Sequence, residues 1–211
     1  MYLSGTVTQA MLGNPRPDLG IMLQPGMGNA IPFRFWRWAA DNGCFAQGAD
    51  FEPGDWLEWL ASVRRHRETC LFAVAPDVYG DAWGTWRTSR PFLPTIRQLG
   101  FKAAYVAQNG LDDIPVDGGP SWGDFDALFI GGDDAYKLSE TAYRLARRAR
   151  DHGKHVHMGR VNSLRRLRAA HISLFDSVDG TYLKFGPDVN IGRLYGWLDQ
   201  INGQQPLELT A

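Results

Sequence analysis

The sequence predicts an α/β protein folded as a compact (β/α)8 TIM-type barrel, and three observations support this. Short apolar runs rich in Val, Ile, Phe and Ala alternate with amphipathic stretches of helical period, as in repeated strand–helix units on a parallel sheet. Seven or eight such units fit into the chain. A length of 211 residues is near the lower limit for this barrel, so we expect some helices to be short or missing.

Each predicted strand is a short apolar run that ends on polar residues or glycine. The strands are expected at residues 19–25, 35–41, 71–77, 102–108, 126–132, 155–160 and 174–179, with residues 1–5 as a candidate eighth. Helices are expected between them at residues 53–66, 90–100, 139–153 and 163–171. Ser139 is a suitable helix start, and Gly100 and Gly153 are natural helix stops.

An open, doubly wound sheet is the alternative to the barrel. Its nucleotide-binding versions carry G-x-G-x-x-G after the first strand or G-x-x-x-x-G-K-[ST], and neither motif is present. No repeat of 20 to 50 residues is visible, and the Pro/Gly-rich segment 115–123 is the one low-complexity stretch. We therefore expect a single barrel domain over residues 1–211.

Charge and cysteine content narrow the class of protein. The formal net charge of −1 argues neither for nor against a polyanionic partner. Only Cys44 and Cys70 are present, which supports neither a disulfide scaffold nor a cysteine zinc site. His155 and His157 share one face of a strand without a third clustered ligand, so we predict no metal and no cofactor. Without a signal-like or long apolar segment, the expected location is the cytoplasm, with no membrane contact.

Polar residues and glycines gather where the predicted strands end. In a barrel of this type, chemistry collects at the carboxyl ends of the strands because these ends converge on one mouth. One such aspartate is often only a helix cap, but three together favour a functional site. The strand ends in order are Asp41, Asp77, Gln108, Gly131 with Gly132, Met158 with Gly159, and Asp179.

Six short motifs in the same order resemble those of the tRNA-guanine transglycosylases. "DNGCF" resembles their D-S-G-G-[FY], "APD" their substrate-reading aspartate, "VAQNG" their V-Q-G-G, "FIGGDD" their L-G-G-L, "HMGRV" their L-M-G-V and "FDSVDG" their D-x-F-D. The motifs extend from about residue 36 to 182. The short chain and the "DSVDGT" segment look most like the phage and bacterial branch that places 7-deazaguanines into DNA, the DpdA group; a phage-encoded member would work in the host cytoplasm, in anti-restriction DNA modification.

The resemblance implies a pentosyltransferase that exchanges bases at a glycosidic bond and uses a carboxylate as nucleophile. It implies that Asp179 is the nucleophile, although an alignment on F-D-S selects Asp176 instead, and that Asp41 does acid/base work. The flat base would lie between Phe45 and Met158. Asp77 and Gln108 would read its edge, and Gly131 and Gly132 would offer backbone N–H groups. Asp176 would otherwise belong to the substrate-binding residues.

Two departures from the family bear on the substrate. The tRNA enzymes have a C-terminal zinc-binding subdomain with three cysteines and a histidine, which this chain cannot build. Since that subdomain helps to bind tRNA, we expect DNA as the polymer and a free 7-deazaguanine such as preQ0 as the second substrate. Cys44 stands where the family has its second glycine, which puts close backbone approach to a ligand at that point in doubt.

Arginines are concentrated at residues 144–150 and 160–168. Arg160, Arg165 and Arg168 are the predicted phosphate contacts, and a solvated helix face is the alternative. Two other functions stay open at this point: a barrel nucleosidase or glycosidase that uses the same aspartates, and a non-catalytic nucleic-acid-binding module. The sequence leaves the oligomeric state open, a homodimer included.

Overall fold

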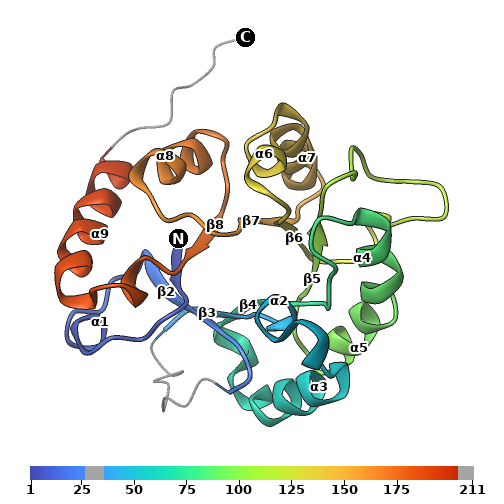
Figure 1. Ribbon diagram of the computed structural model, residues 1–211, viewed down its shortest axis with the longest axis horizontal. Coiled ribbons are helices and arrows are strands. Elements are labelled where there is room, and N and C mark those ends of the chain that lie inside the picture. The colour runs from blue at the N-terminus through green and yellow to red at the C-terminus, as the bar shows by residue number, and fades with distance from the viewer. Residues whose placement is uncertain (27–35, 204–211) are drawn as a thin grey trace.

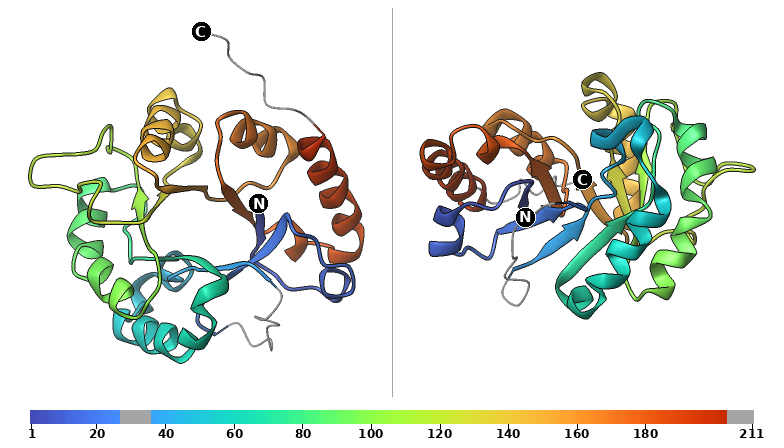
Figure 2. Two further views of the ribbon diagram at one scale, coloured as in Figure 1. Left: turned by 180° about the vertical axis from the view of Figure 1, so that it is seen from behind. Right: turned by 60° about the horizontal axis from the view of Figure 1, so that its bottom comes forward.

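Eight parallel strands pair in chain order and close into a barrel, because β1 pairs with both β2 and β8. The protein is described by a computed structural model that covers residues 1–26 and 36–203. Figure 1 looks into the barrel, with helices around its outside, and Figure 2 shows it from behind and tilted. The predicted (β/α)8 barrel is therefore confirmed.

Every predicted strand segment overlaps one strand of the barrel, although the strands are shorter than predicted, and β4 and β8 each extend one residue beyond their predicted segment. The candidate at residues 1–5 is indeed the eighth strand, and Phe35, which begins one predicted segment, lies outside the described residues. The strands are β1 (Tyr2–Ser4), β2 (Leu19–Leu23), β3 (Trp38–Ala40), β4 (Cys70–Val74), β5 (Ala103–Ala107), β6 (Ala127–Ile130), β7 (His155–Met158) and β8 (Ser177–Gly180).

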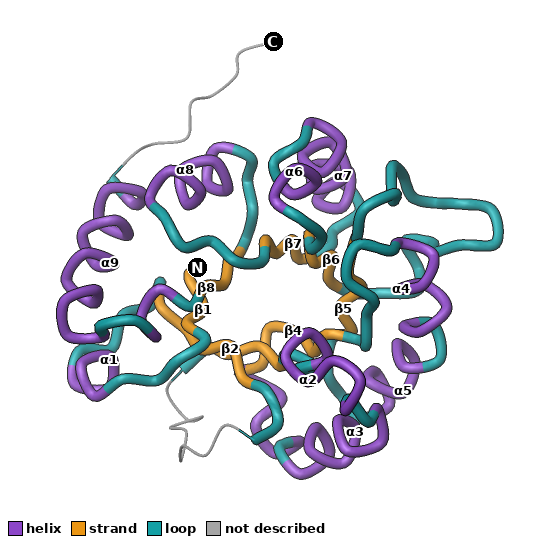
Figure 3. Tube along the Cα trace, viewed as in Figure 1, coloured by secondary structure: helices purple, strands orange, loops and turns teal. Residues whose placement is uncertain are grey.

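Helices form the outer layer (Figure 3), and several are short, as the chain length requires. The α-helices are α1 (Gln9–Gly13), α2 (Cys44–Gln47), α3 (Pro53–Ser62), α4 (Ala82–Ser89), α5 (Phe92–Gln98), α6 (Asp134–Lys137), α7 (Glu140–Asp151), α8 (Leu164–Ile172) and α9 (Pro187–Asn202). The 3-10 turns are η1 (Gly48–Asp50), η2 (Arg64–Thr69) and η3 (Tyr182–Lys184). The four predicted helices correspond to α3, α5, α7 and α8.

Side chains of the strands form two separate apolar layers because successive residues of a strand point to opposite faces. The inner layer fills the barrel. It includes Leu3, Met22, Phe72, Val74 and Val106. The outer layer joins the strands to the helices and includes Ile21, Trp38, Tyr105, Leu128 and Val156. This alternation decides which strand-end side chains reach the mouth of the barrel and which pack beneath the helices.

Candidate active site

A cavity of about 620 Å³ opens at the carboxyl end of the barrel. Every one of the eight strands, or the loop after it, contributes to its lining, from Gly5 after β1 to Asp179 in β8. Such a volume accommodates a nucleotide-sized ligand. The predicted site residues that line the cavity are Asp41, Phe45, Asp77, Gln108, Gly131, Gly132, Arg160 and Asp179.

Asp179 of β8 lines the cavity, and a histidine inside the barrel is hydrogen-bonded to it. Its Oδ1 lies 3.0 Å from Nε2 of His157, which is fully buried on the neighbouring strand β7. Burial lowers the pKa of His157, while Asp179 opposes that shift. The imidazole is therefore neutral near pH 7. It donates a hydrogen bond to the carboxylate and does not form an ion pair with it.

Asp41 follows β3 and faces the same cavity. Burial of its carboxyl group, followed by the charges of Asp179 and Asp77, raises its pKa to about 7. Backbone N–H groups of Gly43 and Asn42 oppose the shift. Asp41 can therefore hold a proton at neutral pH and release it without a large change in free energy, as general acid/base catalysis requires.

Asp77 is fixed in place by neighbours from two other strand ends. Its Oδ2 accepts a hydrogen bond from Nε2 of Gln108 at 2.6 Å, and its Oδ1 accepts one from Nδ2 of Asn42 at 2.9 Å. The Sγ of Cys44 lies 3.0 Å from the same Oδ1. A carboxylate with both oxygens supported has a defined direction toward the cavity, and the Cys44 side chain supports it where the resembling family has a glycine.

Gln108 does not have the free amide that the sequence suggested. Its Nε2 donates to Asp77, and its Oε1 accepts a hydrogen bond from the backbone N–H of Gly80 at 3.0 Å. The side chain is 2% exposed. Because Gln108 lines the cavity, its reading of a base edge stays a prediction, while the same amide holds Asp77 and the loop after β4.

The two glycines after β6 differ in what they offer. The backbone N–H of Gly131 donates to Ala107 within the barrel, so the prediction that it donates to a ligand is wrong. Gly132 has a φ of 78°, and a Cβ there would come within 2.6 Å of Oδ1 of Asn109. Only glycine fits both the conformation and the space.

An aromatic and cationic cluster forms one rim of the cavity. Gly43 turns the chain with a φ of 77°, and this brings Phe45 to the rim. Phe45 is 61% exposed and packs edge-on against Tyr79, which is 50% exposed, at 5.3 Å between ring centroids. The guanidinium carbon of Arg160 lies 3.8 Å from the centroid of Phe45. We call Phe45, Tyr79 and Arg160 the rim cluster.

Arg160 has a φ of 61°, a left-handed conformation that is costly for any residue but glycine. Its carbonyl accepts a hydrogen bond from Arg166, which also pairs with Asp134 on α6. Lys137, 4% exposed, pairs with the same Asp134 and lines the cavity, where burial lowers its pKa. Arg160 and Lys137 thus line the same cavity as the three carboxylates.

Two predicted substrate contacts lie away from the cavity. Met158 is 1% exposed and belongs to the layer between strands and helices, because it has the opposite strand parity to His157 and Gly159. The prediction that it covers one face of a base is therefore wrong. Asp176 precedes β8 at the opposite end of the barrel, where it accepts hydrogen bonds from Arg150 and from the backbone N–H of Val156. Its assignment to the substrate site is also wrong.

The arginines of α8 lie outside the cavity. Arg165 is exposed, and Arg168 donates to Oε1 of Gln200 on α9 at 2.9 Å. Neither the exposure of Arg165 nor the hydrogen bond of Arg168 tests the predicted phosphate binding. Of the three predicted phosphate contacts, Arg160 alone lines the cavity.

Sequence reasoning missed several residues of the site. His157 was treated as structural, and Asn42, Tyr79, Lys137 and Lys184 were assigned no role, yet all but His157 line the cavity. The sequence did carry a signal for His157. It lies two residues before Gly159, so both point to the same face of β7. Its partner Asp179 lies two residues after Ser177, so these two share a face of β8. Within the described residues, no cluster of three or more His, Cys, Asp or Glu side chains could hold a metal ion, and no helix is long and apolar enough to cross a membrane.

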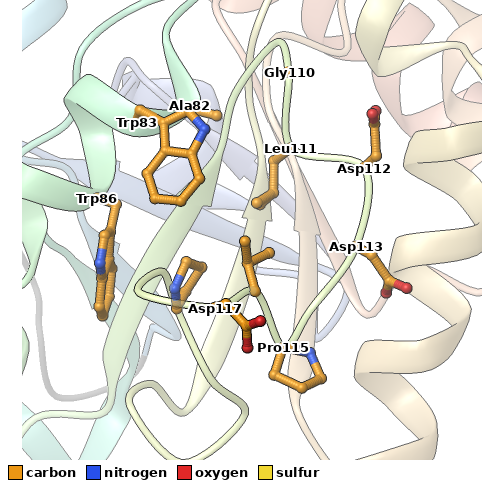
Figure 4. Close-up of a pocket in the computed structure, with 11 residues that line it drawn as sticks. Ala82, Trp83, Trp86, Gly110, Leu111, Asp112, Asp113, Pro115 and Asp117 are labelled. Atoms are coloured by element: carbon orange, nitrogen blue, oxygen red, sulfur yellow. The ribbon is translucent and has the colours of Figure 1, made fainter.

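A second cavity, of about 550 Å³, lies outside the barrel between α4 and the loop after β5. Figure 4 shows Trp83 and Trp86 on one side of Leu111, with Asp112 and Asp113 on the other. None of the predicted site residues lines it.

Comparisons with known proteins add little to this geometry. No protein-family model matches the chain, and no curated protein is similar to it. Among solved structures it resembles the Bacillus subtilis YkuI protein, which has an EAL domain and was crystallised with its substrate c-di-GMP and calcium, at 18% sequence identity and a TM-score of 0.44. The match covers 80% of this chain and 44% of that one.

Proposed function

We propose that this chain is a DNA-guanine transglycosylase that exchanges guanine for a 7-deazaguanine such as preQ0. One observation supports it above all: Asp179, held by a neutral imidazole, shares a cavity with Asp41, whose pKa is raised to about 7. Two carboxyl groups with different environments in one site can divide the roles of nucleophile and acid. Replacing a base at a glycosidic carbon needs that division.

In the first half of the reaction, an oxygen of Asp179 attacks C1′ of the nucleotide. The bond between C1′ and N9 of guanine breaks, and its electron pair goes to the base. Protonated Asp41 gives its proton to the leaving guanine, so guanine departs neutral and Asp41 becomes ionised. The sugar is then held on Asp179 as an ester-like glycosyl intermediate.

In the second half, the incoming 7-deazaguanine occupies the place of guanine. Its N9–H gives a proton to ionised Asp41 while N9 attacks C1′. The bond between C1′ and the Asp179 oxygen breaks, and its electron pair returns to the carboxylate. The enzyme ends in its starting state, so the exchange consumes no cofactor.

Asp77 and the rim cluster support a purine as the base. A fixed carboxylate accepts hydrogen bonds from both the ring N–H and the exocyclic amine of guanine, and 7-deazaguanines keep these two donors. Phe45 and Tyr79 offer exposed aromatic surface beside the cavity. Arg160 places a positive charge where the backbone of an extruded nucleotide would pass, which a nucleic-acid polymer requires and a free nucleoside does not.

Incubation with labelled preQ0 or guanine tests the proposal. Single-stranded DNA, duplex DNA and tRNA are offered in parallel, and label in the polymer and free guanine are both counted. We expect label in DNA, one guanine released for each label incorporated, and no incorporation by Asp179→Asn. Guanine release without incorporation would indicate a hydrolase, label in tRNA alone would move the substrate to RNA, and DNA binding without either product would indicate a binding module.

A further inference from the structure

We propose that His155, Ser177 and His157 form a hydrogen-bonded relay inside the barrel that holds one oxygen of Asp179 and leaves its other oxygen as the attacking atom. The attack by the other oxygen rests on the proposed function, whereas the hydrogen bonds of the relay do not. Its three members are positioning residues, since none of them lines the cavity.

The relay runs across the two adjacent strands β7 and β8. Oγ of Ser177 lies 2.7 Å from Nε2 of His155 and 2.8 Å from Nδ1 of His157. Nε2 of His157 then lies 3.0 Å from Oδ1 of Asp179. All four side chains point to the barrel interior because they occupy alternate positions on their strands.

The identity of the last acceptor fixes the direction of every hydrogen bond. Ionised Asp179 can only accept, so His157 must carry its proton on Nε2. A neutral imidazole then has a bare Nδ1, which must accept the hydroxyl proton of Ser177. The Ser177 oxygen in turn accepts from Nε2–H of His155. One arrangement of protons satisfies all three contacts, with every donor pointing toward Asp179.

Aromatic rings pack against the relay, in which His157 and Ser177 are buried and His155 is partly buried. The His157 ring lies 5.0 Å from the ring of Phe72 and 4.5 Å from that of Phe129, and His155 lies 5.4 Å from Phe72, all between centroids. Burial and the neighbouring His157 lower the pKa of His155 to about 4, so both imidazoles are neutral near pH 7. The titratable groups that face the relay and Asp179 are Met1 through its amine, Tyr2, Asp41, Lys102 and Asp176.

Three polar side chains in an otherwise apolar barrel interior call for a role. Among the described residues, no side chain donates a hydrogen bond to Oδ2 of Asp179. Oδ1 is therefore fixed by His157, and Oδ2 keeps a free lone pair toward the cavity. Fixing one oxygen limits rotation of the carboxylate and orients the other for attack, a gain that appears in kcat rather than in binding.

Nitrogen NMR of labelled protein tests the relay without any substrate. We expect His157 to be the neutral Nε2–H tautomer at neutral pH. Ser177→Ala should keep this tautomer, which Asp179 fixes, but should shift the Nδ1 resonance because Nδ1 loses its hydrogen-bond donor. A wild-type His157 protonated on Nδ1, or an unchanged Nδ1 resonance in Ser177→Ala, would overturn the relay.

Kinetics test the consequence for Asp179. Ser177→Ala should lower kcat by about tenfold with little change in KM, in the range of one hydrogen bond between neutral groups. His157→Gln, whose amide can still donate to Oδ1, should retain more activity than His157→Ala. Ser62→Ala, on the exposed end of α3, is the matched control with unchanged kcat and KM.

The two assays separate the relay from the proposed reaction. An unchanged kcat in Ser177→Ala would overturn the relay even if base exchange occurs. If no base exchange is found with any polymer, the tautomer of His157 in the wild type and its Nδ1 resonance in Ser177→Ala still decide whether the relay exists.

Discussion

Asp176 and Asp179 are three residues apart, and their surroundings give them different roles. Asp176 receives hydrogen bonds from Arg150 and the Val156 backbone at the closed end of the barrel. Asp179 receives one from buried His157 and faces the cavity at the open end. In the proposed reaction the nucleophile must reach its substrate, and of these two aspartates Asp179 lines the cavity.

Replacing each aspartate by asparagine separates the two roles. Asp179→Asn should lower base exchange by roughly 10⁴-fold, the scale seen when a nucleophile is removed. Asp176→Asn should retain exchange and lower the free energy of unfolding by about 1 kcal/mol, through weaker bonding to Arg150 and Val156. Urea unfolding and label incorporation measure the two effects; an inactive but stable Asp176→Asn would reverse the assignment.

Asp41 links stability to pH. Its carboxyl pKa is raised from 3.8 in the unfolded chain to about 7 in the folded protein. Between these values the folded protein binds the extra proton, so the contribution of Asp41 to stability is complete below about pH 4 and is lost as pH rises through 7. Asp41→Asn removes this loss.

The stability difference between Asp41→Asn and the wild type should therefore grow in favour of the variant from about pH 4 to pH 7, by up to about 1 kcal/mol per pH unit, and then level off. Taking the difference cancels the other titrating groups, His155 and His157 among them. Thermal or urea unfolding at several pH values measures it. A difference that stays constant over this range would contradict the raised pKa.

At the scale of the element, strand period explains which predictions succeeded. Strand identity and the order of the strand ends were predictable, because each apolar run ends on a turn-forming or polar residue. The face of the sheet to which each residue points was not predictable, because the ends of each strand were uncertain by one or two positions. That error placed Met158 in the cavity, whereas His157 and Gly159 have the inward parity.

The longest helix, α9, was also missed, for a physical reason. Pro187 stands at its start, and Gly192 and Gly196 lower its intrinsic helix propensity. Burial of Leu194 and Leu198 against the rest of the barrel outweighs that cost. Likewise, the hydrogen bonds that occupy Gln108 join residues from two different loops, the one after β4 and the one after β5, and no local pattern reports them.

Gly180 at the end of β8 provides a test of packing around the site. A Cβ there would meet Oδ1 of Asn162 at 2.5 Å and the carbonyl oxygen of Val161 at 2.6 Å. Gly180→Ala should lower the free energy of unfolding by about 1–3 kcal/mol and disturb Asp179 beside it. In α9, Gly196 has open space around it, so Gly196→Ala should be neutral or stabilising by up to about 1 kcal/mol. Equal effects of both changes in urea unfolding would contradict this packing.

At the scale of the whole molecule, charges of both signs gather around the mouth of the barrel. The net charge of −1 hides three carboxylates within the cavity and cations at its edge, Arg160, Lys137 and Lys184. The sequence showed that arginines cluster in its last third, but not that the turn after β7 brings one of them onto Phe45. Tertiary position, and not local density of arginine, selects the cations that a bound polymer would meet.

Salt dependence of DNA binding tests this selection. Arg160→Ala should weaken binding nearly uniformly across sequences and lower the slope of log K against log salt by about one unit, because one phosphate contact and its released counterion are lost. Arg168→Ala should leave the slope unchanged, since Arg168 is engaged with Gln200 on α9. Arg165 is exposed and remains a predicted phosphate contact. A slope that falls in Arg168→Ala but not in Arg160→Ala would place the DNA along α8, away from the rim cluster.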